Sequence, residues 1–371
     1  MTEFLQFHVL TSYPPSNPNR DDLGRPKTAQ IGEKLRQRIS SQAIKRALRK
    51  SEAFERALAG QMGDRTQRLG EVIVDHLTKR GVEAKQAQVI ARDIAATFGK
   101  VEEKGDREKS VAEKNDKGAN DLVRIKQLAF ISPDERRAAL ALAEDAAAGK
   151  PLPKEKDLAK LLLRKADGAV DIAMFGRMLA DAAEFNREAA VQVAHAFTTN
   201  AIEIEDDYYT AVDDLKTKAE DAGAGFVGEA GFGAGVYYLY ICVDRDQLIA
   251  NLDSDKALAA RGLRALTEAI ATASPTGKIN SFANHVRPEF LLVERGDAQP
   301  RSLASAFTEA VKSPQQMKAS IERLLKQRSD FAAVYGPDWS ADILLRVGDA
   351  SSATLRQLAD FAAEGLEGPV P

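Results

Sequence analysis

Two adjacent carboxylates, Asp21 and Asp22, stand beside Arg20 in a stretch rich in proline and glycine. Paired carboxylates can hold a divalent cation, and a metal-bound water can attack a phosphodiester. The same pair can instead balance neighbouring arginines and fix the shape of a loop. The residues favour this structural interpretation because no third or fourth metal ligand is evident, and metal-dependent hydrolysis is kept as the alternative.

The other residue types that do chemistry are scattered. The four histidines are far apart in sequence, and none stands in an HExxH motif or a histidine–cysteine cluster. There is no GxSxG nucleophile elbow, and the single cysteine, Cys242, excludes both an internal disulfide framework and a multi-cysteine metal site. The segment GFGAGVYYLY precedes a strand, whereas a dinucleotide-binding loop follows a strand and precedes a helix. The sequence therefore predicts no catalytic residues, no metal and no cofactor.

Basic residues concentrate in one stretch. Arg20 to Lys50 contains ten Lys or Arg and three acidic residues, a net charge of +7, while the whole chain carries −3. The remaining residues therefore carry −10. A basic arm on an acidic body indicates a polyanionic partner.

Within this stretch a helix is predicted to begin at Ser40 or Ser41, either of which can cap it, with Ile44 and Leu48 holding it to a sheet. The free backbone N–H groups and positive dipole end at its start favour phosphate. A solvated basic helix face is the alternative, but further basic residues upstream favour nucleic acid. The candidate phosphate ligands on the helix are Ser40, Gln42, Lys45 and Arg46, and the upstream residues are Arg20, Lys27, Lys34, Arg36 and Arg38.

The elements around the basic stretch indicate an α+β fold. Alternation over residues 3–11 predicts a strand, with His8 on its more polar face as a hydrogen-bonded structural residue. Residues 64–164 have helical periodicity and indicate a helical insertion. Alternation over 168–179 predicts a strand that returns to the sheet. With the later strands VYYLYICVD and PEFLLVERG, these elements predict a small mixed sheet with helices on one side, and the ferredoxin-like arrangement fits best.

Two further groups of residues are candidates for contacts. Tyr208 and Tyr209 follow an acidic run that indicates a projecting hairpin or loop, with core packing as the alternative. The glycines from Gly223 to Gly235 are interpreted as hinge or close-backbone positions. The last helix of the insertion groups basic residues that form a solvated face by default and a second nucleic-acid contact in the alternative. These residues are Lys154, Lys156, Lys160, Arg164 and Lys165.

Length and composition are those of a globular protein: 371 residues, 44% hydrophobic, are enough for a sizeable core. The N-terminal MTEFLQFHVL lacks the basic region and apolar stretch of a secretory signal, and no run reaches the length of a membrane span. Together with the lone cysteine, this predicts a cytoplasmic protein with no membrane partner.

Several motifs in order resemble one family. NRDDLG, RISSQAIKRALRKS, VDIAMFGRM, VAHAFTTN and DDYYTAVDDL are similar to the backbone subunit of the type I-E CRISPR Cascade surveillance complex, the CasC type. The resemblance implies a hand-shaped protein that polymerises along a CRISPR RNA with further copies of itself, contacts other Cascade subunits, and presents the guide for pairing with a target DNA strand. It implies an RRM-related, ferredoxin-like palm from residues 1–60 and 167–371, helical fingers from 61–166, and a protruding thumb hairpin at about 190–232.

The resemblance also assigns residues. Met178 is implied to be an apolar wedge beside the guide, Tyr208 and Tyr209 to act near the thumb, and the insertion's basic group Lys154 to Lys165 is a candidate for steering DNA. A metal-dependent ribonuclease of the related type III backbone kind, cutting target RNA with Asp21 or Asp22, is the alternative of a different class. The implied contacts with guide phosphates and sugars are Arg20, Lys27, Ser40, Gln42, Lys45, Arg46 and Arg49.

Overall fold

The computed structural model forms two compact units, each described here by itself. The residues that it describes are 2–102, 121–211 and 226–366. The first unit, called the sheet unit, comprises Met1–Ala57, Gln192–Arg245 and Leu263–Gly365.

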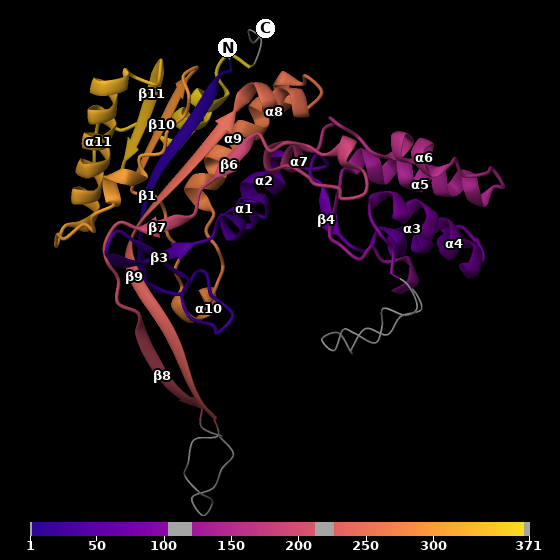
Figure 1. The fold of residues 1–371 in the computed structure, drawn as a ribbon, viewed down its shortest axis with the longest axis horizontal. Helices are drawn as coiled ribbons and strands as arrows, with labels where there is room; N and C mark the ends of the chain where they lie inside the picture. Colours follow the sequence, from indigo (N-terminus) through magenta and orange to yellow (C-terminus); the bar gives the residue numbers. More distant parts are fainter. Residues whose placement is uncertain (1, 103–120, 212–225, 367–371) are drawn as a thin grey trace, which may run out of the picture. The chain divides into compact units, whose positions relative to one another are not determined.

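One antiparallel sheet forms the sheet unit (Figure 1). Across this sheet the strands follow one another in the order β11 (Ala341–Arg346), β10 (Phe290–Gly296), β1 (Phe4–Ser16), β9 (Phe226–Asp244), β7 (Ala196–Thr198), β3 (Lys34–Ile39) and β2 (Thr28–Ile31). A short strand, β6 (Val191–Val193), also pairs with β9.

Four of these strands and two helices carry the ferredoxin-like pattern. Along the chain they run β1, helix α1 (Ser41–Arg49), β7, β9, helix α9 (Lys256–Thr272) and β10. Their order across the sheet is β10, β1, β9, β7, because β1 pairs with both β10 and β9, and β9 pairs with β7. Numbered along the chain, these are the fourth, first, third and second strands of the pattern, which is the ferredoxin-like order. The predicted α+β, ferredoxin-like fold is confirmed.

Helices cover both faces of the sheet, so the prediction of helices on one side was wrong. On one face, Ile44 of α1 and Ile270 of α9 line a cavity of about 50 Å³ together with Val9 of β1 and Tyr237 of β9. On the other face, helix α11 (Gln316–Tyr335) packs Ile321 and Leu324 into an apolar cluster with residues of the strands. Those residues are Leu10, Val236, Tyr238, Phe290 and Leu292.

The more polar face of β1 is buried because its polar groups find partners there. His8 is fully buried, with Nε2 at 3.2 Å from a Glu294 carboxylate oxygen and Nδ1 at 3.0 Å from the Tyr238 hydroxyl. Arg328 of α11 donates to the same carboxylate at 2.5 Å. A buried charge that is paired and hydrogen-bonded escapes most of its desolvation cost. The structural interpretation of His8 is confirmed.

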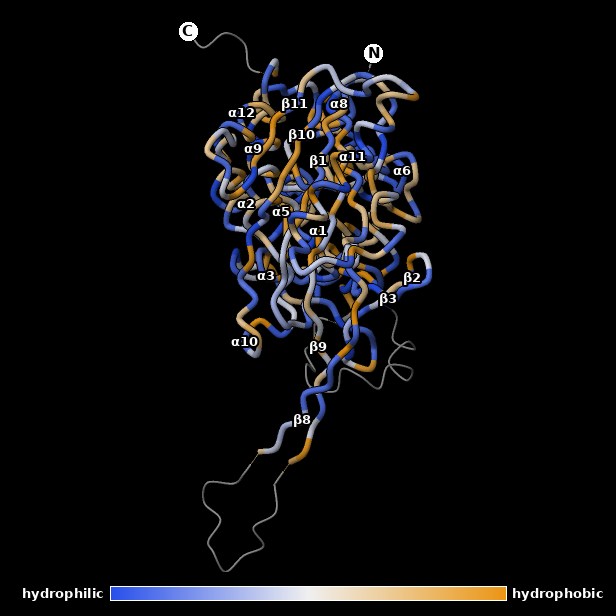
Figure 2. The backbone as a smooth tube through the Cα atoms, turned by 90° about the vertical axis from the view of Figure 1, so that its left-hand side faces the viewer, coloured by the Kyte–Doolittle hydropathy of each residue, from blue (hydrophilic) through white to orange (hydrophobic). Residues whose placement is uncertain are grey.

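A two-stranded ribbon projects beyond the sheet, formed by β8 (Glu205–Ala211) and the first part of β9 (Figures 1 and 2). Its acidic start is hydrophilic, whereas the sheet strands are largely hydrophobic (Figure 2). Tyr209 faces Gly228 across the ribbon, and a Cβ there would lie 2.6 Å from the tyrosine ring. The close-backbone interpretation therefore holds at Gly228, although its context is a strand. Residues 212–225, which belong to the predicted thumb, lie outside the described residues.

The helical unit consists chiefly of Leu58–Val191 and Asp246–Gly262, so it continues past residue 166, where the sequence placed the end of the insertion. A two-stranded sheet of β4 (Asp64–Thr66) and β5 (Ala129–Ile131) accompanies its helices. The predicted helices are confirmed as α3 (Leu69–Lys79), α4 (Ala84–Ala95), α5 (Pro133–Ala147) and α6 (Glu155–Leu162). The charged stretch between α4 and α5 falls largely on residues 103–120, outside the described residues.

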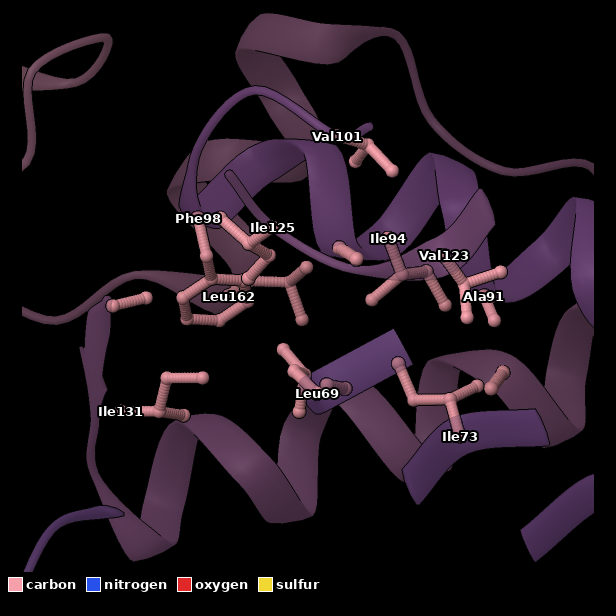
Figure 3. Close-up of a cluster of buried hydrophobic side chains, with 14 of the residues drawn as sticks. Leu69, Ile73, Ala91, Ile94, Phe98, Val101, Val123, Ile125, Ile131 and Leu162 are labelled. Atoms are coloured by element: carbon pink, nitrogen blue, oxygen red, sulfur yellow. The ribbon is translucent and has the colours of Figure 1, made fainter. Parts of the chain in front are cut away.

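A hydrophobic core holds the helical unit together. Figure 3 shows Leu69 and Ile73 of α3 packing near Ile94 of α4, and Phe98 beside Leu162 of α6. Every one of these side chains is buried. The core therefore stabilises this unit from within, without relying on its polar surface.

Residues 168–179 are not a strand. They contain helix α7 (Val170–Phe175), in which Val170, Asp171 and Ile172 are all fully buried. Asp171 can be buried because one carboxylate oxygen accepts the Gly63 and Ile172 backbone N–H groups. A short segment buried on every side has no polar face, so its apparent alternation carried no information on secondary structure.

The sequence also missed several strands. Strand β1 continues through Pro14 and Pro15 to Ser16, and β2, β3, β4, β5 and β11 were not predicted. The remaining helices are α2 (Glu52–Ala57), α8 (Arg245–Asn251), α10 (Ile279–Phe282) and α12 (Leu355–Ala363), with 3₁₀ turns at Ala96–Phe98, Asp121–Val123, Ala183–Phe185 and Ala304–Phe307. Within the described ranges, no helix is long and apolar enough to cross a membrane.

Candidate nucleic-acid interface

Helix α1 begins and packs as its sequence predicts. Ser40 is the N-cap, and its hydroxyl accepts the Ala43 backbone N–H at 3.3 Å. Ile44 and Leu48 are buried, which leaves the basic residues of the helix on its outer sides. Gln42 and Arg46 are exposed, whereas Lys45 is half-buried, and this burial lowers the pKa of its ammonium group.

Asn19 ties the preceding loop to the start of this helix. Its side-chain oxygen accepts the Ser40 backbone N–H at 2.8 Å, and its carbonyl accepts the Lys27 N–H at 2.9 Å. The Lys27 carbonyl in turn accepts the Arg38 N–H at 2.8 Å. These bonds bring the loop that carries Arg20 and Lys27 to the capping end of α1. The predicted phosphate ligands at residues 20, 27 and 40–46 therefore share one edge of the sheet unit.

Arg36 does not belong to this surface, contrary to its inclusion among the upstream basic residues. It is fully buried in β3, and its guanidinium donates to the carbonyls of Thr198, Thr199 and Phe307 at 2.7–3.0 Å. Burial and then the charge of Arg323 lower its pKa. Arg36 and Arg38 lie on the same face of β3, because side chains two residues apart in a strand share a face, but Arg36 is buried whereas Arg38 is partly accessible.

His195 is a member of the interface that the sequence did not identify. Its Nδ1 lies 3.3 Å from the Ser41 backbone N–H and 3.3 Å from Nη1 of Arg38. Both groups are donors, so Nδ1 accepts and the neutral ring carries its proton on Nε2. Partial burial and the charges of Arg38 and Lys27 lower the pKa of His195. No sequence signal links residues 154 positions apart, although His195 stands in the VAHAFTTN motif.

The carboxylates at residues 21 and 22 differ in their surroundings. One Asp21 oxygen accepts the backbone N–H groups of Leu23 at 3.0 Å and Arg25 at 2.9 Å, so this side chain holds the loop in shape. Asp22 is exposed. No group of three or more His, Cys, Asp or Glu within the described part of the chain is placed to hold a metal ion. The geometry at Asp21 favours the structural interpretation of the pair.

Met178 is 81% exposed and follows an arginine anchored inside the helical unit. Arg177 donates to both carboxylate oxygens of Glu135 at 2.6 and 2.8 Å, and to the carbonyls of Phe130, Arg164 and Phe185. This anchor fixes the turn that presents the methionine. An apolar side chain held outward in this way fits the wedge role that the sequence resemblance implies.

The thumb tyrosines are surface residues. Tyr208 is 66% exposed and Tyr209 is 42% exposed, with the Tyr209 ring centroid 6.1 Å from that of Phe226. Core packing, the alternative interpretation of this pair, is wrong for the described structure. Exposed aromatic rings on a projecting ribbon are available for stacking or wedging.

The second basic group lies on α6 and beyond it. Its lysines at 154, 156, 160 and 165 are exposed, while Leu158 and Leu162 hold the helix to the core of the helical unit. Arg164 is half-buried, and its Nη1 donates to the Leu161 carbonyl at 3.1 Å. The four lysines thus form an accessible basic surface, and a contact with nucleic acid remains a prediction.

The fold and this edge define a two-unit α+β protein whose basic residues are gathered at the start of one helix. The chain belongs to the CT1975-like protein family of Cas proteins, whose family model matches residues 5–365. No curated protein sequence matches the chain.

Solved structures are similar over nearly the whole chain. A chain from a "CRISPR RNA-guided surveillance complex, pre-nicking" has 28% sequence identity and a TM-score of 0.81. A chain from a "CRISPR RNA-guided surveillance complex" has 25% identity and a TM-score of 0.71. Each match covers 97% of this chain and 99% of the other.

Proposed function

We propose that this chain is the non-catalytic backbone subunit of a type I-E CRISPR surveillance complex, the CasC type. It polymerises along a CRISPR RNA together with further copies of itself, assembles with the other Cascade subunits in the cytoplasm, and serves antiviral defence. The family membership and the full-length similarity to chains of CRISPR RNA-guided surveillance complexes support this role.

One observation carries the proposal. The loop with Arg20 and Lys27 is bonded to the start of α1, so its cations join the capped helix end and the basic residues of the helix at one edge of the sheet unit. Hydroxyl, amide, ammonium and guanidinium groups at a helix start are donors suited to phosphate and 2′-OH oxygens. The guide-binding residues are Arg20, Lys27, Ser40, Gln42, Lys45, Arg46 and Arg49.

This donor set suits a protein that accepts any guide sequence. Such a protein gains nothing from reading base edges, so it binds the backbone and leaves the bases outward for pairing with target DNA. Met178 and the exposed Tyr208 and Tyr209 act as apolar wedges that interrupt the guide at intervals. The exposed lysines at 154, 156, 160 and 165, with Arg164, steer the DNA; guide–target exchange is nearly balanced in energy, so such contacts can tip it.

The ribonuclease alternative has less support. One carboxylate oxygen of Asp21 accepts two backbone N–H groups, and no group of three or more His, Cys, Asp or Glu in the described part of the chain is placed to complete a metal site around it. We therefore assign residues 21 and 22 to the shape of the loop.

Mixing the purified full-length protein with RNAs of graded length and unrelated sequence tests the proposal. We expect the number of copies per RNA, measured by light scattering after gel filtration, to rise in whole steps with RNA length and not to depend on sequence. A single copy on every RNA would contradict a backbone subunit and favour a monomeric RNA-binding protein.

A further inference from the structure

A cavity of about 640 Å³ lies beside α1 in the sheet unit. One wall is α1 and its C-terminal cap, where Arg46 and the cap residue Lys50 line the cavity. The opposite wall is the segment between α9 and β10, which contributes Arg287. Lys50 and Arg287 have no role in the interface described above.

The three basic residues of this cavity are placed for an anion. Among the described contacts, no carboxylate forms an ion pair with Arg46, Lys50 or Arg287, whereas nearby Arg56 pairs with Glu268 at 2.5 Å. Arg287 is held in position because its Nη1 donates to the Thr272 carbonyl at 2.5 Å. Its guanidinium retains further donors in a rigid fork that matches phosphate oxygens. Cations that line one cavity without a carboxylate partner indicate a negatively charged ligand.

The wall opposite α1 has a costly conformation. Lys278 and Ala283, at the two ends of α10, adopt the left-handed region with φ of 52° and 48°. Asn284 is fully buried, and neither its side-chain oxygen nor its side-chain nitrogen has a partner among the described residues. Non-glycine residues in this region and unpaired buried amides tend to occur where a site requires them. The strain therefore points to a functional segment.

Gly277 connects this wall to the candidate interface. A Cβ at this position would lie 2.3 Å from the Pro18 carbonyl oxygen, so only glycine lets the two segments meet. Pro18 itself lines the cavity and precedes Asn19, which is bonded to the start of α1. The cavity and the capped helix end are therefore neighbouring parts of one surface.

The lining of the cavity suits a backbone phosphate better than a base. It offers hydroxyl groups at Ser274 and Thr276, and His285 is the one aromatic ring in the described lining that could stack. Base recognition by single-strand binders depends on aromatic platforms, which this lining does not supply. Glu52 adds one residue with a carboxylate to the lining, which disfavours a ligand as highly charged as a free polyphosphate.

We propose that this cavity binds a backbone phosphate of the single strand held by the protein, with Lys50 and Arg287 as ligands in addition to Arg46. The proposal rests on the proposed RNA-binding function and extends the strand's path along the second side of α1. A phosphate of the guide RNA and a phosphate of the paired target DNA have the same chemistry at this site.

The test is the salt dependence of binding by the full-length protein with Lys50→Gln and Arg287→Gln combined. One lost phosphate contact is expected to lower the slope of log Kd against log salt by roughly 0.7 for a single strand, so the pair, which share one phosphate, should lower it by up to roughly 0.7. Fluorescence anisotropy with a labelled single-stranded RNA measures the slope. Combining Lys50→Gln with Arg287→Lys instead of Arg287→Gln keeps one of the two charges and should recover about half of the change in slope.

Two matched pairs keep the result interpretable. Lys326→Gln with Arg356→Gln removes two exposed cations from α11 and α12 and should leave the slope unchanged. Lys45→Gln with Arg49→Gln, on α1 outside the cavity lining, should lower the slope if the proposed function is right. Thermal unfolding of every variant verifies folding.

Each outcome decides the proposal. A lower slope on RNA assigns the cavity to the guide, and a loss seen only when the RNA-loaded protein captures complementary DNA assigns it to the target strand. If the Lys50 and Arg287 pair behaves like the exposed pair both on RNA and in the capture of complementary DNA, while the Lys45 and Arg49 pair lowers the slope, the cavity proposal is overturned and the RNA-binding function stands. If neither the Lys50 and Arg287 pair nor the Lys45 and Arg49 pair changes the slope, both the cavity proposal and the proposed RNA-binding function are refuted.

Discussion

The buried carboxylate of Glu135 organises the turn that presents Met178, and Glu135→Ala is the substitution that tests this. One carboxylate oxygen accepts the Ser132 backbone N–H at 2.9 Å, and the other accepts the Arg164 backbone N–H at 2.8 Å. Both oxygens accept from Arg177, and the two charged side chains are 0% and 1% exposed. Alanine removes all of these acceptors at once.

The loss of stability follows from what remains buried. Removing one partner of a buried ion pair costs about 3–5 kcal/mol, because the other charge stays behind. Carbonyl contacts to Phe130, Arg164 and Phe185 still serve Arg177 and reduce the cost, while the orphaned N–H groups of Ser132 and Arg164 add to it. We expect the free energy of unfolding to fall by about 4 kcal/mol. This is a large part of the total for a typical domain, which is about 5–15 kcal/mol.

Hydrogen exchange, followed peptide by peptide, is the suitable assay because two units need not unfold in one step. A loss of about 4 kcal/mol makes exchange in α5 and in the turn at Met178 roughly a thousandfold faster. Glu144→Ala is the control on the same helix: its carboxylate is 43% exposed and pairs with His76 and Arg80, so about 1 kcal/mol or less should be lost. Equal effects of the two substitutions would refute the reasoning.

The remaining predictions concern the interface. The folded protein lowers the pKa of His195, so the unfolded chain binds the proton of this side chain more readily. The stability that depends on neutral His195 is therefore fully present above about pH 6.5 and is lost as the pH falls below that value. Thermal unfolding between about pH 7.5 and 5.5 should therefore depend less on pH in His195→Asn, which keeps an acceptor but cannot titrate; parallel profiles would contradict this. With magnesium and complementary RNA, the assembled protein should cut nothing. Cleavage that disappears in Asp21→Ala or Asp22→Ala would instead establish the ribonuclease.

The capped helix α1 was predictable because its determinants are local. A serine whose hydroxyl reaches the N–H three residues on, and apolar residues four apart, lie within a single turn or two of the chain. The basic residues that follow stand on the sides left free by Ile44 and Leu48, so their accessibility follows from the same pattern. Local sequence was thus sufficient to predict the part of the candidate interface that helix α1 contributes.

The other half depends on contacts between distant segments. Asn19 binds Ser40, and His195 meets Ser41 and Arg38, and nothing in the chain's periodicity joins these positions. The secondary structure of α7 was predicted wrongly for a related reason: in a segment buried on all sides by tertiary contacts, alternation of residue types does not report the secondary structure. The periodicity of a sequence shows which face of an element is exposed to water, so it gives no information on an element that has no exposed face.

The protein positions its two sets of exposed candidate side chains by different physical means. At α1, the basic residues are placed by backbone hydrogen bonds and one neutral side chain, Asn19, so a cation can be removed without exposing a buried charge. At Met178, the placement depends on a fully buried ion pair between Arg177 and Glu135, so any change there couples function to folding. Substitutions at α1 should therefore change affinity in steps of one phosphate contact, while substitutions behind Met178 should act on the whole helical unit. This difference makes α1 the place where binding can be measured apart from stability.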